Sequence, residues 1–189
     1  LSIGVETFNK RYLTFLNRHH KLDEVKKKIN MLKQLGFNNI NIDLIYALPN
    51  QTLAELENDI DEFLKLGIKH ISTYSLMIEP HTKLYIDDVK SIDEDLDYKM
   101  YSLICKKLHD NGFIHYEVSN FAKLGYESKH NLVYWDNLEY YGFGVGASGY
   151  IDGIRYDNTR NLSYYLKGEW LDNEHLLSLN ERIENEVFI

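Results

Sequence analysis

The sequence predicts an α/β fold in which parallel strands form part of a barrel-like sheet, followed by a region of α+β character. Apolar and polar residues alternate in three segments, residues 1–6, 39–46 and 70–78, and helical patterns lie between these segments. Crossovers of this length join parallel strands. The segments have polar second faces, which favours a barrel that binds a ligand at the carboxyl ends of its strands.

The first two segments place acidic residues on their polar faces. "LSIGVE" has Ser2, Gly4 and Glu6 on one face and apolar residues on the other. "NINIDLIY", residues 39–46, repeats the alternation and places Asp43 on its polar face. We expect Glu6, Asp43 and residues 77–79 to lie at the carboxyl ends of the three strands. Three strands do not close a barrel, so we expect partner strands to precede residue 1 and the chain to be a piece of a longer protein.

Two amphipathic helices separate the three segments. Residues 21–35 carry apolar side chains at spacings of three and four, and Gly36 is the expected C-terminal cap. Thr52 and Glu55 have the spacing of a capping box and open the second helix, which Gly67 ends.

After the third strand the expected elements are shorter. A helix should begin near Ser91, which has capping-box spacing to Glu94, and end at Gly112. Strand-like runs follow at residues 113–121 and 131–135, where tyrosine becomes frequent. These runs predict the α+β region.

The C-terminal part begins with a glycine-rich stretch. "GFGVGASGY", residues 142–150, contains the G-x-G-x-x-G spacing of dinucleotide-binding loops. Asp152 and Gly153, a strong hairpin signal, follow it, whereas a dinucleotide site needs a helix to begin there. The pattern therefore excludes a dinucleotide loop and indicates glycines that permit close approach or positive φ. Helical segments at 161–168 and 178–189 complete the chain.

Composition excludes several classes of protein. The 29 acidic residues outnumber the 21 basic ones, and a net charge of −8 argues against nucleic-acid binding. No apolar run approaches the roughly 18 residues of a membrane span. The single cysteine, Cys105, excludes an internal disulfide, suits the cytoplasm and is expected to be a buried structural thiol. The oligomeric state stays open.

Seven motifs occur in one order: "LSIGVETF", "NRHH", "NINIDLIYALPNQT", "YSLMIEPHT", "EVSNFA", "HNLVYW" and "GFGVGAS". Together they resemble the radical-SAM family of oxygen-independent coproporphyrinogen III oxidase and HemW, a haem chaperone, and HNxxYW is more similar to HemW. The resemblance covers essentially the whole chain. It implies the C-terminal half of a partial (β/α)6 radical-SAM barrel in residues 1–90, an accessory α+β region in 91–177 and the start of a helical domain in 178–189.

The family holds a [4Fe–4S] cluster through a CxxxCxxC loop after its first strand and leaves the fourth iron position for S-adenosylmethionine. This sequence has no such loop, and Cys105 alone does not hold a cluster. The resemblance thus implies a radical-SAM oxidoreductase family whose cluster ligands lie outside this chain. We expect the chain alone to be inactive, and whether the protein is an enzyme stays open.

The resemblance assigns three side chains to S-adenosylmethionine. Asp43 matches an aspartate that accepts hydrogen bonds from the ribose hydroxyls, with a structural anchor as the alternative. Arg18 matches an arginine that meets the cofactor carboxylate, with an exposed helix arginine as the alternative. Glu6 stands where the family usually has glutamine, so either a donor contact is lost or the cofactor's amino group is its partner.

Three further positions are assigned to the same cofactor by resemblance. Met77 matches a position whose backbone lies along the adenine. Ala147 and Ser148 lie where the glycine-rich stretch passes nearest to the cofactor, although HemW relatives often carry histidine and then serine after the alanine.

His130 is the expected haem ligand, since a neutral imidazole is a standard axial ligand of haem iron. Tyr134 and Trp135 offer flat surfaces for a porphyrin. The alternative for His130 is a hydrogen-bonded residue packed beside aromatic rings, and the sequence leaves both roles open.

The function that the resemblance implies is that of a HemW-type protein, which binds haem and passes it to acceptor proteins. The first alternative is the oxidase, which decarboxylates two propionates of coproporphyrinogen III to give protoporphyrinogen IX. The second alternative is a non-catalytic α/β module that binds another nucleotide-like ligand.

Overall fold

The computed structural model describes residues 1–188 and divides into two compact units, one from Leu1 to Glu127 and the other from Ser128 onward. The first unit contains β1 (Ser2–Glu6), α1 (Lys10–Phe15), α2 (Leu22–Gln34), β2 (Asn41–Tyr46), α3 (Leu53–Lys65), β3 (His70–Ser75), α4 (Lys83–Ile86), α5 (Glu94–Asp110), β4 (Ile114–His115) and β5 (Asn120–Ala122). The second contains α6 (Lys129–Trp135), β6 (Ser148–Ile151), β7 (Ile154–Asn158), α7 (Leu162–Leu166), β8 (Leu171–Leu176) and α8 (Leu179–Phe188). The predicted domain boundaries after residues 90 and 177 stay predictions.

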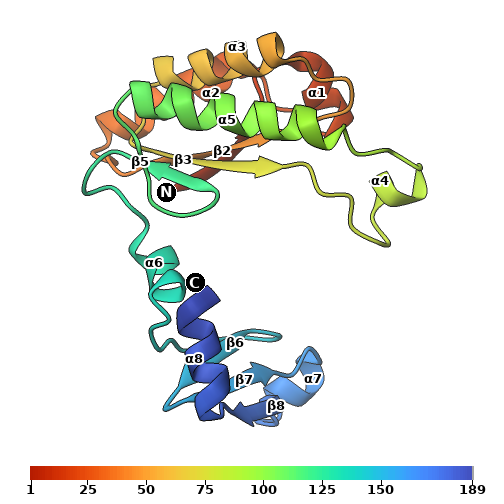
Figure 1. Ribbon diagram of the computed structural model, residues 1–189, viewed down its shortest axis with the longest axis vertical. Coiled ribbons are helices and arrows are strands. Elements are labelled where there is room, and N and C mark those ends of the chain that lie inside the picture. The colour runs from red at the N-terminus through yellow and green to blue at the C-terminus, as the bar shows by residue number, and fades with distance from the viewer. Residues whose placement is uncertain (189) are drawn as a thin grey trace. The chain divides into compact units, whose positions relative to one another are not determined.

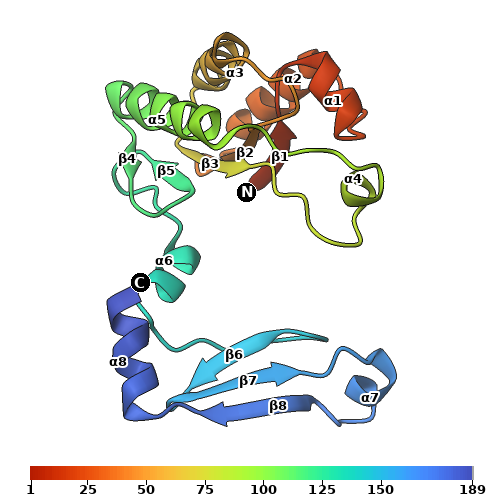
Figure 2. The ribbon, with the colours of Figure 1, turned by 45° about the vertical axis from the view of Figure 1, so that its right-hand side comes forward.

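Five strands form the sheet of the first unit, in the order β1-β2-β3-β5-β4. β2 pairs in parallel with both β1 and β3, as the sequence predicts, whereas β5 pairs antiparallel with both β3 and β4. Figure 1 shows α2, α3 and α5 on one side of this sheet, and Figure 2 shows the same layering after a turn about the vertical axis. The three helices therefore cover one face of the strands.

The apolar face of the sheet packs against these helices and forms the core. Ile42, Leu44, Ile71, Phe63 and Met100 are each at most 1% exposed. Side chains alternate across a strand, so the residues of β1, β2 and β3 that stand between the apolar ones lie on the opposite face of the sheet. That face carries Ser2, Gly4, Asn41, Asp43, His70 and Ser72.

The helix starts follow the expected capping chemistry with one correction. Thr52 and Glu55 form the predicted capping box of α3, in which Thr52 Oγ1 accepts from Glu55 N–H (3.2 Å) and Glu55 Oε2 accepts from Thr52 N–H (3.0 Å). The prediction that Ser91 caps α5 is wrong, because the cap is Asp93. Asp93 directly precedes the first helical residue, and its Oδ1 accepts hydrogen bonds from the N–H groups of Asp95 and Leu96.

Two strand predictions need correction. Residues 131–135 lie in α6 rather than in a strand, because Ser128 opens a helix by accepting a hydrogen bond from Asn131 N–H (3.3 Å). The aromatic composition of this segment favours a strand, but that preference depends on context and the local cap outweighs it. Within residues 113–121 only the short strands β4 and β5 form.

The second unit is an antiparallel sheet in the order β6-β7-β8, with α7 and α8 where the sequence predicts helices. Asp152 and Gly153 join β6 to β7 with φ angles of 50° and 77°, which confirms the predicted hairpin. β8 was not predicted, because its sequence LDNEHL is exposed throughout and lacks the alternation of a half-buried strand.

Candidate functional site

Glu6 and Arg18 form an ion pair at the carboxyl end of β1. Nη2 of Arg18 lies 2.7 Å from Oε1 of Glu6, whose side chain is 7% exposed, whereas 52% of the Arg18 side chain is exposed. Glu6 has a φ of 69°, and the pairing of β1 with β2 is irregular between Gly4 and Glu6. Such an irregularity re-aims a side chain at the end of a strand.

The Glu6 side chain lies over Gly4, next to Asp43. A methyl group built on Gly4 would lie 2.7 Å from Oε1 of Glu6 and 4.0 Å from Oδ2 of Asp43. The two carboxylates therefore flank Gly4 on the same face of the sheet. We refer to Glu6, Arg18 and Asp43 as the acidic cluster.

Burial raises the pKa of Glu6, the Arg18 guanidinium lowers it and the neighbouring Asp43 charge raises it. The electrostatic interaction with His20 lowers the pKa of Glu6 more weakly. The acidic cluster thus contains two carboxylates and one guanidinium. An additional positive group bound there would stabilise both charged carboxylates, because opposite charges within a few ångströms favour the ionised form.

Asp43 lies in the middle of β2 rather than at its end, and pairs with Gly4 of β1. Its Oδ1 accepts hydrogen bonds from Asn41 Nδ2 (2.8 Å) and Ser2 Oγ (3.4 Å). Within residues 1–188 no hydrogen bond from the protein reaches its Oδ2. That oxygen is the part of Asp43 that remains for a ligand.

A buried carboxyl group anchors the loop that follows Glu6. Asp59 of α3 is 1% exposed and accepts from Thr7 Oγ1 (2.5 Å) and from the Phe8 N–H (2.9 Å). Thr7 directly follows Glu6, so this anchor holds the backbone on which Glu6 adopts its positive φ. No motif in the sequence points to Asp59.

Replacing Asp59 with asparagine is expected to change how the stability of the protein depends on pH. Burial raises the pKa of Asp59 to about 6, and the two hydrogen bonds only partly offset this rise. A raised carboxyl pKa contributes stability that is present below the unfolded pKa, near 4, and is lost as the pH rises through 6. Relative to Asp59→Asn, the wild type should lose about 2 kcal/mol of unfolding free energy between pH 4 and pH 7. Urea titrations of both proteins measure this difference, and a difference that is constant with pH contradicts it.

Met77 lies just beyond β3, with 71% of its surface exposed. It lines a cavity of about 330 Å³ together with Ala47, Ser75 and Asp97, and Ser75 Oγ donates to Asp97 Oδ2 (3.0 Å). This cavity lies at the carboxyl ends of β2 and β3. Among the described residues no hydrogen bond or ion pair links Met77 to the acidic cluster, and its contact with an adenine stays a prediction.

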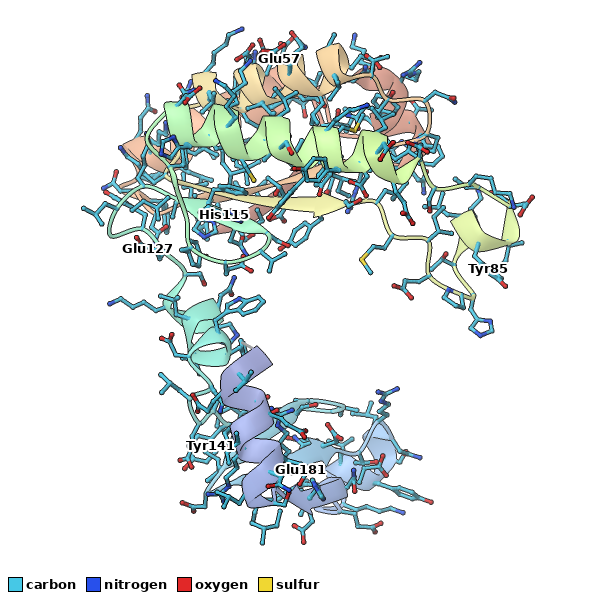
Figure 3. The ribbon with its side chains drawn as sticks, in the orientation of Figure 1. Glu57, Tyr85, His115, Glu127, Tyr141 and Glu181 are labelled. Carbon is cyan, nitrogen blue, oxygen red and sulfur yellow. The ribbon has the colours of Figure 1, made fainter. Side chains whose placement is uncertain are left out.

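Ala147 and Ser148 lie in the second unit, where the glycine-rich stretch enters β6. Ser148 Oγ donates to Asp157 Oδ1 (2.5 Å), and Ala147 O accepts from the Asn158 N–H (2.8 Å). Figure 3 labels Tyr141 on the segment that leads into this stretch. The placement of Ala147 and Ser148 beside residues of the first unit stays a prediction.

Close contacts and backbone angles within the second unit explain why glycine occupies these positions. A methyl group on Gly142 would lie 2.3 Å from the Ser148 backbone oxygen, and Gly144 and Gly146 have φ angles of 102° and 70°. Asn158 Nδ2 donates to the carbonyl oxygens of Gly142 (3.1 Å) and Gly144 (2.9 Å). A strand follows these glycines, which confirms that the stretch is not a dinucleotide loop.

His130, Tyr134 and Trp135 lie on α6 and are exposed. His130 Nε2 lies 3.1 Å from the Tyr134 hydroxyl, and the two rings meet edge to face with centroids 5.0 Å apart. Tyr134 also packs edge to face against Tyr140, at 4.6 Å between centroids. The structure thus brings His130 and Tyr134 together one helical turn apart.

Comparison with known proteins agrees with this architecture. Residues 1–63 match the model of the Radical SAM superfamily. All of this chain aligns with the heme chaperone HemW of Lactococcus lactis subsp. lactis (strain IL1403) at 45% identity, and with that of Bacillus subtilis (strain 168) at 40%. This chain is related to the HemW-type radical-SAM proteins. It spans about half the length of these curated relatives, 52% of each.

The fold of this chain also matches a solved structure. The structure described as "Coproporphyrinogen III oxidase (HemN) from Escherichia coli is a Radical SAM enzyme" superposes with a TM-score of 0.83 and 20% identity, over 99% of this chain and 48% of that one. This match confirms the predicted fold class. No helix in residues 1–188 is long and apolar enough to cross a membrane, and within that range no group of three or more His, Cys, Asp or Glu residues could hold a metal ion.

Proposed function

We propose that this chain is part of a HemW-like protein that binds S-adenosylmethionine at the acidic cluster, binds haem, and passes the haem to acceptor proteins. The observation that carries the proposal is the placement of the Glu6 and Asp43 carboxylates around Gly4, with Arg18 paired to Glu6. The names of the relatives, heme chaperone HemW, support the haem part. We place the function in the cytoplasm because the chain has a single cysteine.

The chemistry of the acidic cluster fits S-adenosylmethionine group by group. Asp43 is acceptor-only when ionised, so Oδ2 is suited to ribose hydroxyls, which donate. The half-exposed Arg18 guanidinium suits the carboxylate of the methionine part. Glu6 accepts and does not donate, so its partner is the ammonium group, which also supplies the additional positive charge that the two carboxylates favour.

The residues of this chain do not fit an iron–sulfur cluster. Cys105 is the single cysteine; it lies on α5, and burial raises the pKa of its thiol, which disfavours the thiolate that iron requires. We therefore assign no cluster ligand in this chain. Met77 joins the proposed S-adenosylmethionine site by resemblance alone, and the assignment of Ala147 and Ser148 to the same cofactor stays a prediction.

The haem would be bound on α6, where His130 and Tyr134 already contact each other. A neutral imidazole offers one nitrogen lone pair to iron. His130 Nε2 hydrogen-bonds to the Tyr134 hydroxyl, which can rotate away when a ligand approaches. The exposed rings of Tyr134 and Trp135 then offer surface to the porphyrin plane.

Replacing His130 with alanine is expected to weaken the Soret band that appears when ferric haem is titrated into the whole protein. The loss of the axial imidazole removes the bond to iron, while the aromatic surface stays in place. His109→Ala is the matched control, because His109 is an exposed histidine on α5 outside the proposed site. An unchanged titration for His130→Ala would remove His130 from the ligand role.

The oxidase alternative has a separate test. Coproporphyrinogen III, S-adenosylmethionine and a reductant are incubated with the whole protein without oxygen, and tricarboxylic and dicarboxylic porphyrinogens are measured. We expect no decarboxylation at useful rates. Steady product formation would favour the oxidase over the haem chaperone.

A further inference from the structure

A chain of hydrogen bonds crosses three strands on the polar face of the sheet and reaches Asp43. The Asn41 side-chain amide lies at its centre, and its Nδ2 donates to Asp43 Oδ1 and to Ser2 Oγ, both at 2.8 Å. Its Oδ1 accepts from His70 Nδ1 (2.7 Å) and from Ser72 Oγ (3.2 Å). The amide therefore uses both of its donors and both of its acceptor positions.

His70 extends this series of hydrogen bonds to Tyr116. His70 is 4% exposed, and its Nε2 lies 2.6 Å from the Tyr116 hydroxyl. Asn41 and His70 face each other because β2 and β3 pair in parallel in that register. The chain thus runs from Tyr116 through His70 and Asn41 to Asp43.

The direction of every hydrogen bond follows from the charge of Asp43. An ionised carboxylate only accepts, so Asn41 must present its NH₂ group to Asp43 and its oxygen to His70. That oxygen also only accepts, so His70 carries a proton on Nδ1. In a neutral imidazole Nε2 is then the acceptor, and the Tyr116 hydroxyl donates to it.

Burial keeps His70 in this neutral form. Burial lowers the pKa of His70, and the charge of Glu127 only raises it more weakly. A buried side chain with both ring nitrogens engaged has one orientation and one tautomer. At the Asp43 end of this series of hydrogen bonds, Oδ1 is already occupied, whereas Oδ2 receives no hydrogen bond from residues 1–188. Oδ2 is therefore the atom that a ligand could contact.

We propose that His70 is a positioning residue for Asp43: its Nδ1–H fixes the Asn41 amide, which holds Asp43 by Oδ1 and directs Oδ2 toward the ribose hydroxyls of the ligand. This inference rests on the proposed function, in which Asp43 contacts S-adenosylmethionine. His70 itself contacts no ligand. It acts through Asn41, in the way that outer partners orient the groups that bind.

Two substitutions of His70 separate positioning from packing. Asparagine places an amide N–H where His70 has Nδ1, so His70→Asn can still donate to Asn41. Glutamine places its amide near the position of Nε2, so His70→Gln keeps a partner for Tyr116 and loses the bond to Asn41. In calorimetric titrations of the whole protein with S-adenosylmethionine, His70→Gln should raise the Kd by about 10-fold and His70→Asn should recover most of that loss.

A measurement without ligand tests the same inference independently. Nitrogen-15 NMR of the ligand-free wild type should show His70 protonated at Nδ1 and unprotonated at Nε2. The opposite tautomer overturns the inference, as does an equal loss of affinity in both variants. The tautomer also decides the matter if either variant fails to fold. A wild type that does not bind S-adenosylmethionine at all overturns the proposed function, and the inference with it.

Discussion

Replacing Asp43 with asparagine is expected to weaken S-adenosylmethionine binding by roughly 10- to 100-fold, because hydrogen bonds to a charged group are stronger than neutral ones. The substitution keeps the size of the side chain and removes its charge. It also releases the constraint on Asn41, whose amide is oriented by the acceptor-only carboxylate. Isothermal titration calorimetry with the whole protein measures the effect.

A ligand without ribose hydroxyls is the first control for this prediction. A 2′,3′-dideoxy analogue of S-adenosylmethionine lacks the hydroxyls that Asp43 is proposed to accept from, so Asp43→Asn should change its affinity by less than about threefold. Asp23→Asn removes the same charge from an exposed position in the first turn of α2 and should change neither affinity. An equal loss for both ligands would show that Asp43 does not contact the ribose.

Replacing Gly142 with alanine is expected to destabilise the second unit by about 3 kcal/mol, because the added methyl group overlaps backbone that has little freedom to move. Its carbon would lie 2.3 Å from the oxygen and 2.5 Å from the carbonyl carbon of Ser148, at the start of β6. The Tyr156 hydroxyl accepts the Gly142 N–H (2.9 Å), which further restricts the movement of Gly142.

A second glycine of the same stretch serves as the matched control. Gly144 has a φ of 102°, but a methyl group there meets no atom within 4 Å. Gly144→Ala should therefore cost only backbone strain, roughly 1–2 kcal/mol. Hydrogen exchange of the Tyr150 amide, which donates to Tyr140 O (2.8 Å), reports the local stability of β6 in both variants. The prediction fails if Gly144→Ala loosens this amide as much as Gly142→Ala.

The parallel half of the fold could be predicted because its signals are local. Period-two alternation locates β1, β2 and β3, and the capping box at Thr52 with the glycine at position 67 brackets α3. The errors fall where a short segment carries two conflicting signals. The segment 131–135 has strand-like composition, but the cap at Ser128 makes it a helix.

The candidate site could be predicted only in part. Alternation predicts that Glu6 and Asp43 lie on the polar faces of their strands, and the structure brings their carboxylates to the same glycine. The hydrogen-bond chain through His70 was not predicted, because it depends on the register that pairs Asn41 with His70 and on Tyr116, 46 residues further along the chain. Alternation shows which face a residue occupies, and register decides which residue it meets.

A crystal structure of the whole protein with S-adenosylmethionine is the most direct test of the acidic cluster as a cofactor site. We predict that Asp43 Oδ2 lies within hydrogen-bonding distance, about 2.6–3.2 Å, of a ribose hydroxyl, with the Arg18 guanidinium on the ligand carboxylate. A bound ligand that contacts neither Asp43 nor Arg18 would contradict the account.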